Sequence, residues 1–134
     1  MYLQVYQDRK KYERFDTNHY LLYLNEQSAE FTPGGGTQSA NEEPAIPVPG
    51  YSYTGDHPDG GTLIEAKENS YDTFVNGLIR KRYPEATVEA IQSNMIVALT
   101  DPENARSAEF TQEWNTFQEY RTECKAKADE VLSR

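Results

Sequence analysis

The second half of the chain places hydrophobic residues every three or four positions, which predicts helices with one apolar face. A first helix is expected over about 71–83, with Asn69 or Ser70 as its N-terminal cap. Pro84 separates it from a second helix over about 85–99. The apolar side chains expected to point inward from the second helix are Val88, Ile91, Met95, Ile96 and Leu99.

A third helix is predicted over about 102–132, because Asp101 followed by Pro102 is typical of a helix start. Its inward positions alternate in steps of four and three, as in a heptad stripe, and they are Phe110, Trp114, Phe117, Arg121, Cys124, Ala128 and Val131. The aromatic half should pack on the first two helices. The alanine-rich half beyond Tyr120 has little apolar bulk, so it should project or pair with another chain. We expect the helical core to consist of Phe74, Leu78, Ile91, Phe110, Trp114 and Phe117.

The first half of the chain instead contains short runs of aromatic and branched residues, which are typical of strands. Residues 2–6 and 19–24 are two such runs, and the turn-forming residues 16–18 precede the second. A strand pair of this kind is marginal in water unless another part of the molecule covers it.

The stretch from Gly50 to Ala66 contains two further strand candidates, residues 51–54 and 62–66. The loop between them contains Pro58-Asp59-Gly60-Gly61, a strong turn signal, because Pro fixes its own φ and Gly tolerates a positive one. The stretch therefore predicts a β-hairpin with a long loop.

Residues 28–50 are rich in proline and glycine and show no strand or helix pattern, apart from possible polyproline structure around 44–49. They predict a linker arm, and an ordered arm would imply that a neighbouring protein chain holds it. The expected architecture is α+β. Its parts are an N-terminal strand region (1–27), the linker arm (28–50), a β-hairpin (51–67) and a three-helix module (68–134).

Charge restricts the classes of partner. The 134-residue chain has a formal net charge of −9, and residues 32–72 contribute most of it. Such a chain repels phosphate, which disfavours nucleic-acid binding. The basic run Arg80-Lys81-Arg82 falls at a predicted helix end, where it would balance the helix dipole. No apolar run is long enough for a membrane helix, and the first residues lack a signal-peptide pattern, so we expect synthesis in the cytoplasm.

No group of residues predicts a catalytic, metal or cofactor site. Asp56, His57 and Asp59 could bind a metal ion, but no second ligand cluster supports them and each suits a turn. The run 34–36 lacks the Lys-Ser/Thr that follows the glycines of a phosphate-binding loop. Cys124, the single cysteine, excludes an internal disulfide and is expected to be a buried thiol. We therefore expect no enzymatic activity.

Tyrosines are concentrated in the first half of the chain. Tyrosine is favoured in protein interfaces, because it combines a large rigid contact area with a polar tip. Partner binding and simple strand packing both stay open as explanations. The candidate interface residues are Tyr2, Tyr6, Tyr20, Tyr23, Tyr51 and Tyr53.

The helical half resembles small tail-associated proteins of phages and prophages, especially those of gut Bacteroidetes. The similarity begins with the hairpin residues 59–66 and is carried by the segment 71–83, with its Tyr, apolar pair and Leu-Ile-Arg-x-x-Tyr. It continues through Glu89-Ala90-Ile91 and the closing 110–126 helix with its Glu-Cys-Lys element. At residues 92–94 the family carries a more basic run, and residues before the hairpin match nothing in it.

The resemblance implies a virion protein without enzymatic activity, made in the bacterial host cytoplasm. Its partners would be other virion proteins, in a homo-oligomer or a larger hetero-assembly. We expect association through residues 1–53, with the helical module as a rigid anchor. One alternative is a tail-fibre assembly chaperone that is absent from the mature particle. The other is a small glycan- or receptor-binding module that uses Tyr51, Tyr53 and the loop 56–61.

Overall fold

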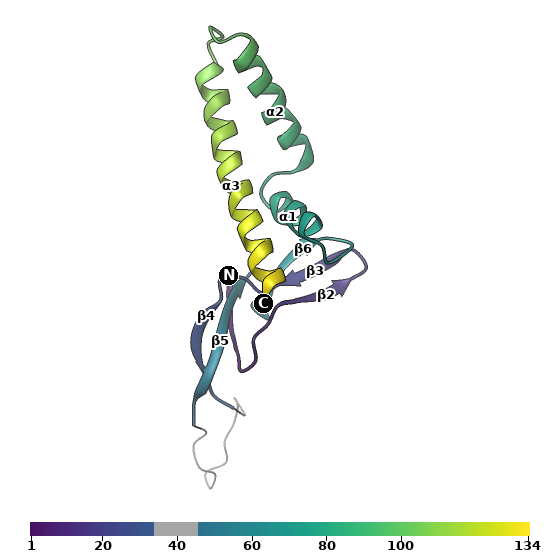
Figure 1. Cartoon of the computed structure of the whole chain (residues 1–134), viewed down its shortest axis with the longest axis vertical. Helices are drawn as coiled ribbons and strands as arrows, with labels where there is room; N and C mark the ends of the chain where they lie inside the picture. Colours follow the sequence, from purple (N-terminus) through teal and green to yellow (C-terminus); the bar gives the residue numbers. More distant parts are fainter. Residues whose placement is uncertain (34–45) are drawn as a thin grey trace. The chain divides into compact units, whose positions relative to one another are not determined.

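A computed structural model of the chain describes residues 1–33 and 46–134. It contains strands and helices in an α+β arrangement, as the sequence predicts (Figure 1). The strands are β1 (Tyr2–Tyr6), β2 (Tyr12–Asp16), β3 (His19–Leu22), β4 (Gln27–Phe31), β5 (Val48–Gly55) and β6 (Thr62–Glu65). The helices are α1 (Tyr71–Arg80), α2 (Glu85–Thr100) and α3 (Ser107–Ser133). Two compact units divide the chain: the first is Met1–Leu63 with Arg134, and the second is Ile64–Ser133.

Strand β5 is the centre of the first unit's antiparallel sheet, whose order is β1-β5-β4. In the β1–β5 pair, Tyr2 lies opposite Gly55 and Tyr6 opposite Tyr51. On the other side, β4 pairs with β5 from Gln27 opposite Ser52 to Phe31 opposite Val48. Both edges of β5 are therefore occupied by strands that precede it in the sequence.

The predicted hairpin over residues 51–67 is wrong, although both of its strands exist. Strand β6 belongs to a different sheet, of order β2-β3-β6, and does not pair with β5. The reason is that β1 pairs with residues 51–55 of β5 on one side and β4 with residues 48–52 on the other, while the Thr54 amide near the loop donates to the Leu24 carbonyl at 3.2 Å. The turn itself forms as predicted, and Gly60 adopts a positive φ of 85°.

Both ends of the predicted linker, residues 28–50, belong to strands. Residues 28–31 belong to β4 and residues 48–50 to β5, and each segment is a strand because it pairs with the other. Their side-chain pattern does not signal this pairing, which depends on chain segments about 20 residues apart. Residues 34–45 lie outside the described part of the chain, so the expected order of the arm stays a prediction.

Strand β2 was missed by the sequence pattern. It pairs with β3 across the turn-forming residues 16–18, with Tyr12 opposite Leu22 and an irregularity between Arg14 and Asp16. The predicted 19–24 strand therefore lies between β2 and β6, while the 2–6 strand pairs with β5. The two predicted strands exist but do not form one pair.

Helix α1 begins where the sequence predicts and ends earlier than predicted. The Ser70 hydroxyl accepts a hydrogen bond from the Thr73 amide at 3.3 Å, the expected cap. The helix ends at Arg80 instead of residue 83, because the Lys81 and Arg82 amides donate to carbonyls three residues earlier and form a turn, and Pro84 disfavours the α conformation at Tyr83. Gly77 lets α1 approach the end of β6, since a Cβ there would lie 2.7 Å from the Glu65 carbonyl oxygen.

Helix α2 buries a different stripe from the predicted one. Val88, Ile91 and Ala98 are buried and Met95 is half-buried. Ile96 and Leu99 are 61% and 69% exposed, so their predicted inward position is wrong. The buried stripe continues through residues 95 and 98. Ile96 and Leu99 each directly follow one of these residues, and successive side chains on a helix point about 100° apart, so both lie outside the stripe.

Helix α3 starts at Ser107, five residues later than predicted, because residues 102–106 form turns. The Asn104 side chain accepts from the Arg106 amide at 2.9 Å, and its carbonyl accepts from the Ser107 amide at 3.0 Å. The helix lies beside α2 (Figure 1).

The far half of α3 does not project as predicted, because three of its apolar residues are fully buried. They are Cys124, Ala128 and Val131, while the one polar member of the stripe, Arg121, is exposed. Tyr120 also donates a hydrogen bond from this half to the Leu78 carbonyl of α1 at 3.0 Å. Of the predicted core, Trp114 is half-buried, and the buried members are Phe74, Leu78, Ile91, Phe110 and Phe117.

Candidate functional site

Three tyrosine rings meet in the core of the first unit, and we call them the tyrosine cluster. Tyr6 ends β1, Tyr53 lies on the central strand β5, and Tyr23 directly follows β3. The ring centroids of Tyr23 lie 6.0 Å from Tyr6 and 5.6 Å from Tyr53, with interplanar angles of 83° and 72°. Such edge-to-face pairs contribute about 0.5–1.5 kcal/mol beyond their buried area.

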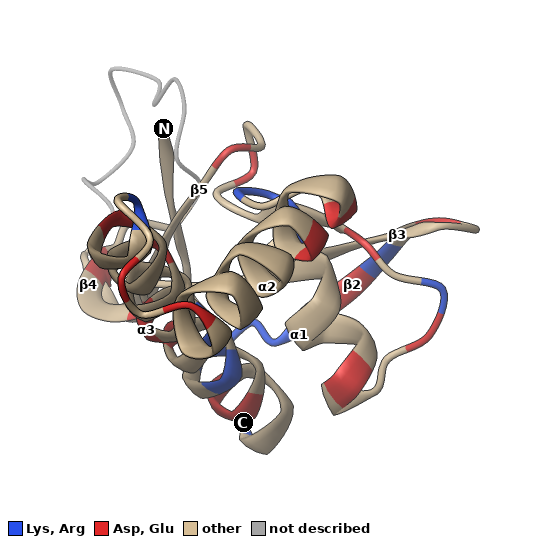
Figure 2. Cartoon of the chain, turned by 90° about the horizontal axis from the view of Figure 1, so that it is seen from above, with Lys and Arg blue, Asp and Glu red and all other residues tan. Residues whose placement is uncertain are grey.

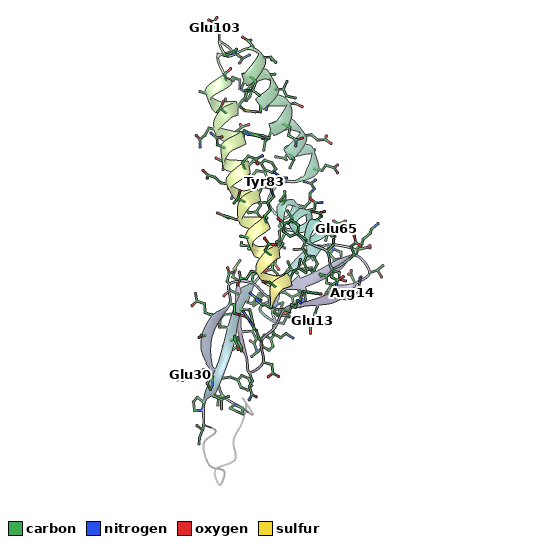
Figure 3. The ribbon with its side chains drawn as sticks, viewed as in Figure 1. Glu13, Arg14, Glu30, Glu65, Tyr83 and Glu103 are labelled. Atoms are coloured by element: carbon green, nitrogen blue, oxygen red, sulfur yellow. The ribbon has the colours of Figure 1, made fainter. Side chains whose placement is uncertain are left out.

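The hydroxyl groups of the cluster end on acidic or backbone oxygens. The Tyr23 hydroxyl lies 2.8 Å from Asp59 Oδ2 and 3.0 Å from Glu13 Oε2. The Tyr53 hydroxyl donates to Glu26 Oε2 at 2.7 Å, and Tyr6 donates to the Asp59 carbonyl at 2.5 Å. Figure 3 labels Glu13 on β2. Each phenol of the tyrosine cluster therefore has the acceptor that burial requires.

These surroundings keep the phenols neutral. Burial, together with hydrogen bonds to Asp59 and Glu13, raises the pKa of Tyr23 far above its ordinary value. Burial and the Glu26 hydrogen bond raise the pKa of Tyr53 to about 12. Burial alone would raise the pKa of Asp59, but hydrogen bonds from Tyr23, the Gly61 amide and His57 lower it overall. At neutral pH the cluster therefore holds neutral phenols against ionised carboxylates.

Cations complete this polar network. The Lys10 ammonium lies 4.8 Å from the Tyr23 ring centroid and 3.1 Å from Glu13 Oε1. Arg9 approaches both carboxylate oxygens of Glu26, at 2.9–3.1 Å. Arg134 Nε lies 3.5 Å from Glu26 Oε2, and the Arg134 side chain is almost fully buried. The arrangement stabilises the first unit and presents no activated nucleophile.

Burial divides the six tyrosines predicted as a partner interface. Tyr20, Tyr23 and Tyr53 are buried in the first unit, so they cannot serve as free contact residues. Tyr6 and Tyr51 are half-buried, whereas Tyr2 is 51% exposed. The acidic partners Glu13, Glu26 and Asp59 were not predicted. Buried tyrosines imply polar partners, but which acids they are depends on the strand register.

The loop 56–61 uses its own polar groups to hold its turn. Asp59 Oδ1 accepts from the Gly61 amide at 2.8 Å and lies 3.1 Å from His57 Nδ1. Asp56 Oδ1 accepts from the Leu63 amide at 2.9 Å. Together with the buried Tyr53, these bonds leave few free groups for the glycan-binding alternative, although Tyr51 stays half-exposed.

The structure also bears on the metal, thiol and membrane-helix questions raised by the sequence. Among the residues that the structure describes, no three or more His, Cys, Asp or Glu side chains are grouped so that they could hold a metal ion. Cys124 is buried, and burial raises the pKa of its thiol, which makes a reactive thiolate unfavourable. No helix in the described ranges has the length and apolarity to cross a membrane.

Three exposed apolar residues of the first unit lie together at the start of β1, an edge strand of its sheet, whereas Phe15 and Ile46 are exposed elsewhere in the unit. Tyr2 and Leu3 are 51% and 63% exposed, and Met1 before them is also exposed. Within residues 1–33 and 46–134, β1 forms strand pairing on one side only, with β5. We call Tyr2, Leu3 and the open side of β1 the β1 edge.

Comparison of the chain with protein-family models, curated proteins and solved structures finds no match.

Proposed function

We propose that the protein is a non-enzymatic structural or adaptor protein of a phage particle, in its tail, baseplate or fibre region. It acts by docking to neighbouring protein chains. The assignment to a particle is supported by the resemblance of residues 59–132 to tail-associated phage proteins. The docking role is supported by one structural observation, the exposed apolar β1 edge.

An open strand edge with apolar side chains is a ready template for strand addition. Its unpaired amide and carbonyl groups provide hydrogen bonds, and its side chains provide specificity. In β1 the far end is anchored, because the Tyr6 hydroxyl donates to the Asp59 carbonyl. Tyr2 and Leu3 occupy adjacent positions, so their side chains point to opposite faces of the sheet. An incoming strand of a neighbouring particle protein would be contacted on both faces.

The tyrosine cluster supports this proposal because it makes the strand that carries the β1 edge rigid. Its hydrogen bonds connect β1 and the residue after β3 to Asp59 of the loop 56–61, and they connect β5 to Glu26, which fixes the backbone next to the β1 edge. Docking to a preorganised edge loses less conformational entropy than docking to a mobile one.

The proposal is tested on particles purified from the bacterial strain that encodes the chain. We expect mass spectrometry to find the wild-type protein in the particle. A Leu3→Lys variant should be depleted at least tenfold, because a charge on an edge strand opposes strand addition. Ile96→Lys is the matched control, since Ile96 is similarly exposed on α2, and it should be incorporated normally.

Two results would count against the proposal. Absence of the wild-type chain from particles would favour the assembly-chaperone alternative. Equal incorporation of Leu3→Lys and wild type would show that the β1 edge is not the docking surface. Light scattering on the purified protein gives its copy number. If the wild type is a stable oligomer and Leu3→Lys dissociates it, the neighbouring chain is a second copy of the protein.

A further inference from the structure

A pocket of about 280 Å³ lies among the three helices of the second unit. Its apolar lining consists of Ile79, Val88 and Phe117, which are all buried, and the half-buried Trp114. Its polar lining comes from all three helices and consists of Asn76, Arg80, Gln92, Gln118 and Arg121. We call it the arginine pocket. Near it, Tyr83 lies between α1 and α2 and packs its ring 5.1 Å from that of Phe117 (Figure 3).

The sign of the charge in this pocket is opposite to that of the chain. The chain has a net charge of −9, yet the ionised residues that line the pocket are two arginines and no acid. Arg80 and Asn76 also line a larger cleft of about 710 Å³ in the same unit, where the acidic residues are Glu65, Glu68 and Glu85, whereas Arg121 lines the arginine pocket alone. Figure 2 shows how the acidic and basic positions are distributed over the helices.

The two guanidinium groups of the pocket are not used elsewhere in the described structure. Arg9 and Arg106 each form an ion pair with a glutamate, whereas Arg80 and Arg121 form none with any described residue. Arg80 lies at the end of α1, where it balances the helix dipole. That role does not explain Arg121, which interrupts the apolar stripe of α3 one turn from Phe117 and Gln118.

The pocket is built on regular helices, which hold its groups in place. Asn76 and Arg80 are one turn apart on α1, and Trp114, Gln118 and Arg121 are spaced by four and three residues on α3. Residues at these spacings share one face of a helix. The guanidinium and amide donors therefore converge on a pocket that has an indole at its wall.

We infer that the arginine pocket binds a small anion, a carboxylate or phosphate group carried on an aromatic or apolar body. Guanidinium groups bind such oxyanions through paired hydrogen bonds, and amide side chains add further donors. The indole of Trp114 and the apolar residues contact the body. The volume is below that of sites for drug-sized ligands, so the pocket suits about one ring with one acidic group. This inference does not rest on the proposed docking function.

The test uses the fluorescence of Trp114, which is the only tryptophan in the chain. The full-length protein is excited at a wavelength that selects tryptophan and titrated with benzoate, and then with benzamide, its neutral analogue of the same shape. We expect a saturable change with benzoate and at least tenfold weaker binding of benzamide. Added salt should weaken the benzoate response, since ions screen exposed charges. No saturable change, or equal responses to both compounds, would overturn the inference.

Variants tie the signal to the arginines. Arg121→Gln and Arg80→Gln should each weaken benzoate binding at least tenfold. Arg106→Gln removes an equal charge outside the pocket and should leave binding unchanged. Arg121→Lys should restore less than half of the affinity, because an ammonium cannot form the paired contact. Binding that all variants retain, with circular dichroism showing that they are folded, would place the anion elsewhere and contradict the inference.

Two further probes separate the sources of the anion. Phenyl phosphate tests phosphate against carboxylate on the same ring. The capped dipeptide acetyl-Phe-Glu-amide, compared with acetyl-Phe-Gln-amide, tests a carboxylate carried by a protein. Preference for the Glu peptide over benzoate would identify a partner's acidic side chain as the ligand. Preference for benzoate or phenyl phosphate would identify a free small acid.

Discussion

The two units of this chain are stabilised by different kinds of contact. The second unit packs apolar side chains from three helices, with Phe74, Leu78 and Phe117 among its buried residues. The first unit connects segments that are distant in the sequence through antiparallel strands and through tyrosine hydroxyls bound to carboxylates. Apolar packing hardly depends on pH, whereas hydrogen bonds to ionised carboxylates do.

This difference separates the candidate activities as well. In the first unit, the polar groups of the tyrosine cluster bind one another, and the exposed feature is the β1 edge. In the second unit, the arginines of the pocket form no ion pair with a described residue. The first unit therefore has an open strand edge, and the second has a pocket lined by arginines.

The largest effect is expected from removing apolar bulk in the second unit. Phe74→Ala should lower the free energy of unfolding by about 3–5 kcal/mol, because Phe74 is fully buried and its loss leaves a cavity. The change is measured by urea denaturation followed by circular dichroism. Ile96→Ala is the control on a side chain 61% exposed, and a comparable loss there would contradict the burial pattern.

A smaller, pH-dependent effect is expected in the first unit. Tyr23→Phe should lower stability at pH 7 by about 1–2 kcal/mol, because two carboxylates lose a hydrogen-bond donor while the rings still pack. Tyr51→Phe is the control, since the Tyr51 hydroxyl makes no hydrogen bond to the described residues and should change little. Equal losses in the two variants would show that the hydrogen bonds do not stabilise the unit.

The same variant should also alter the response to acid. In the folded protein the pKa of Asp59 lies below its ordinary value of 3.8, so its contribution to stability is present above that pH. The contribution is lost as the pH falls through the lowered pKa. Tyr23→Phe removes one of the bonds that lower this pKa, so its stability should fall less steeply in urea titrations as the pH drops below about 4.

The smallest effect is expected at Trp114. Trp114→Ala should cost about 1 kcal/mol, because the side chain is half-buried on the wall of the arginine pocket. Urea denaturation followed by circular dichroism measures the cost. A loss as large as that of Phe74→Ala would mean that Trp114 is a full member of the core, as the sequence pattern predicts.

The sequence located the helices well because their signals are local. The Ser70 cap, Pro84 and the three-to-four spacing of apolar residues act within a few positions, and α1 and α2 lie within a few residues of their predicted bounds. The same pattern misplaced Ile96 and Leu99. The apolar residues of α2 lie on most sides of the helix, so its composition alone does not say which side a neighbouring helix covers.

Strands and sites were predicted less completely, for physical reasons. The runs 2–6 and 19–24 have strand composition, but their partners are set by register across the whole first unit. Strand β2, with Glu13 and Arg14 in a mostly polar run, has no such composition and exists because it pairs with β3. The arginine pocket could not be predicted from the sequence either, since Arg80 and Arg121 are 41 residues apart and only helix packing brings them together.

The sequence by itself determined the α+β class, the three helices, a cap at Asn69 or Ser70, the turn at Gly60 and the burial of Cys124. Each depends on local backbone preference or on a periodicity within one element. The tertiary structure decided that β5 lies between β1 and β4, that Tyr23 and Tyr53 are core residues with carboxylate partners, and that the β1 edge stays open. These features depend on contacts between distant segments. The free energy of such contacts is set by strand register and side-chain packing, which a short stretch of sequence does not reveal.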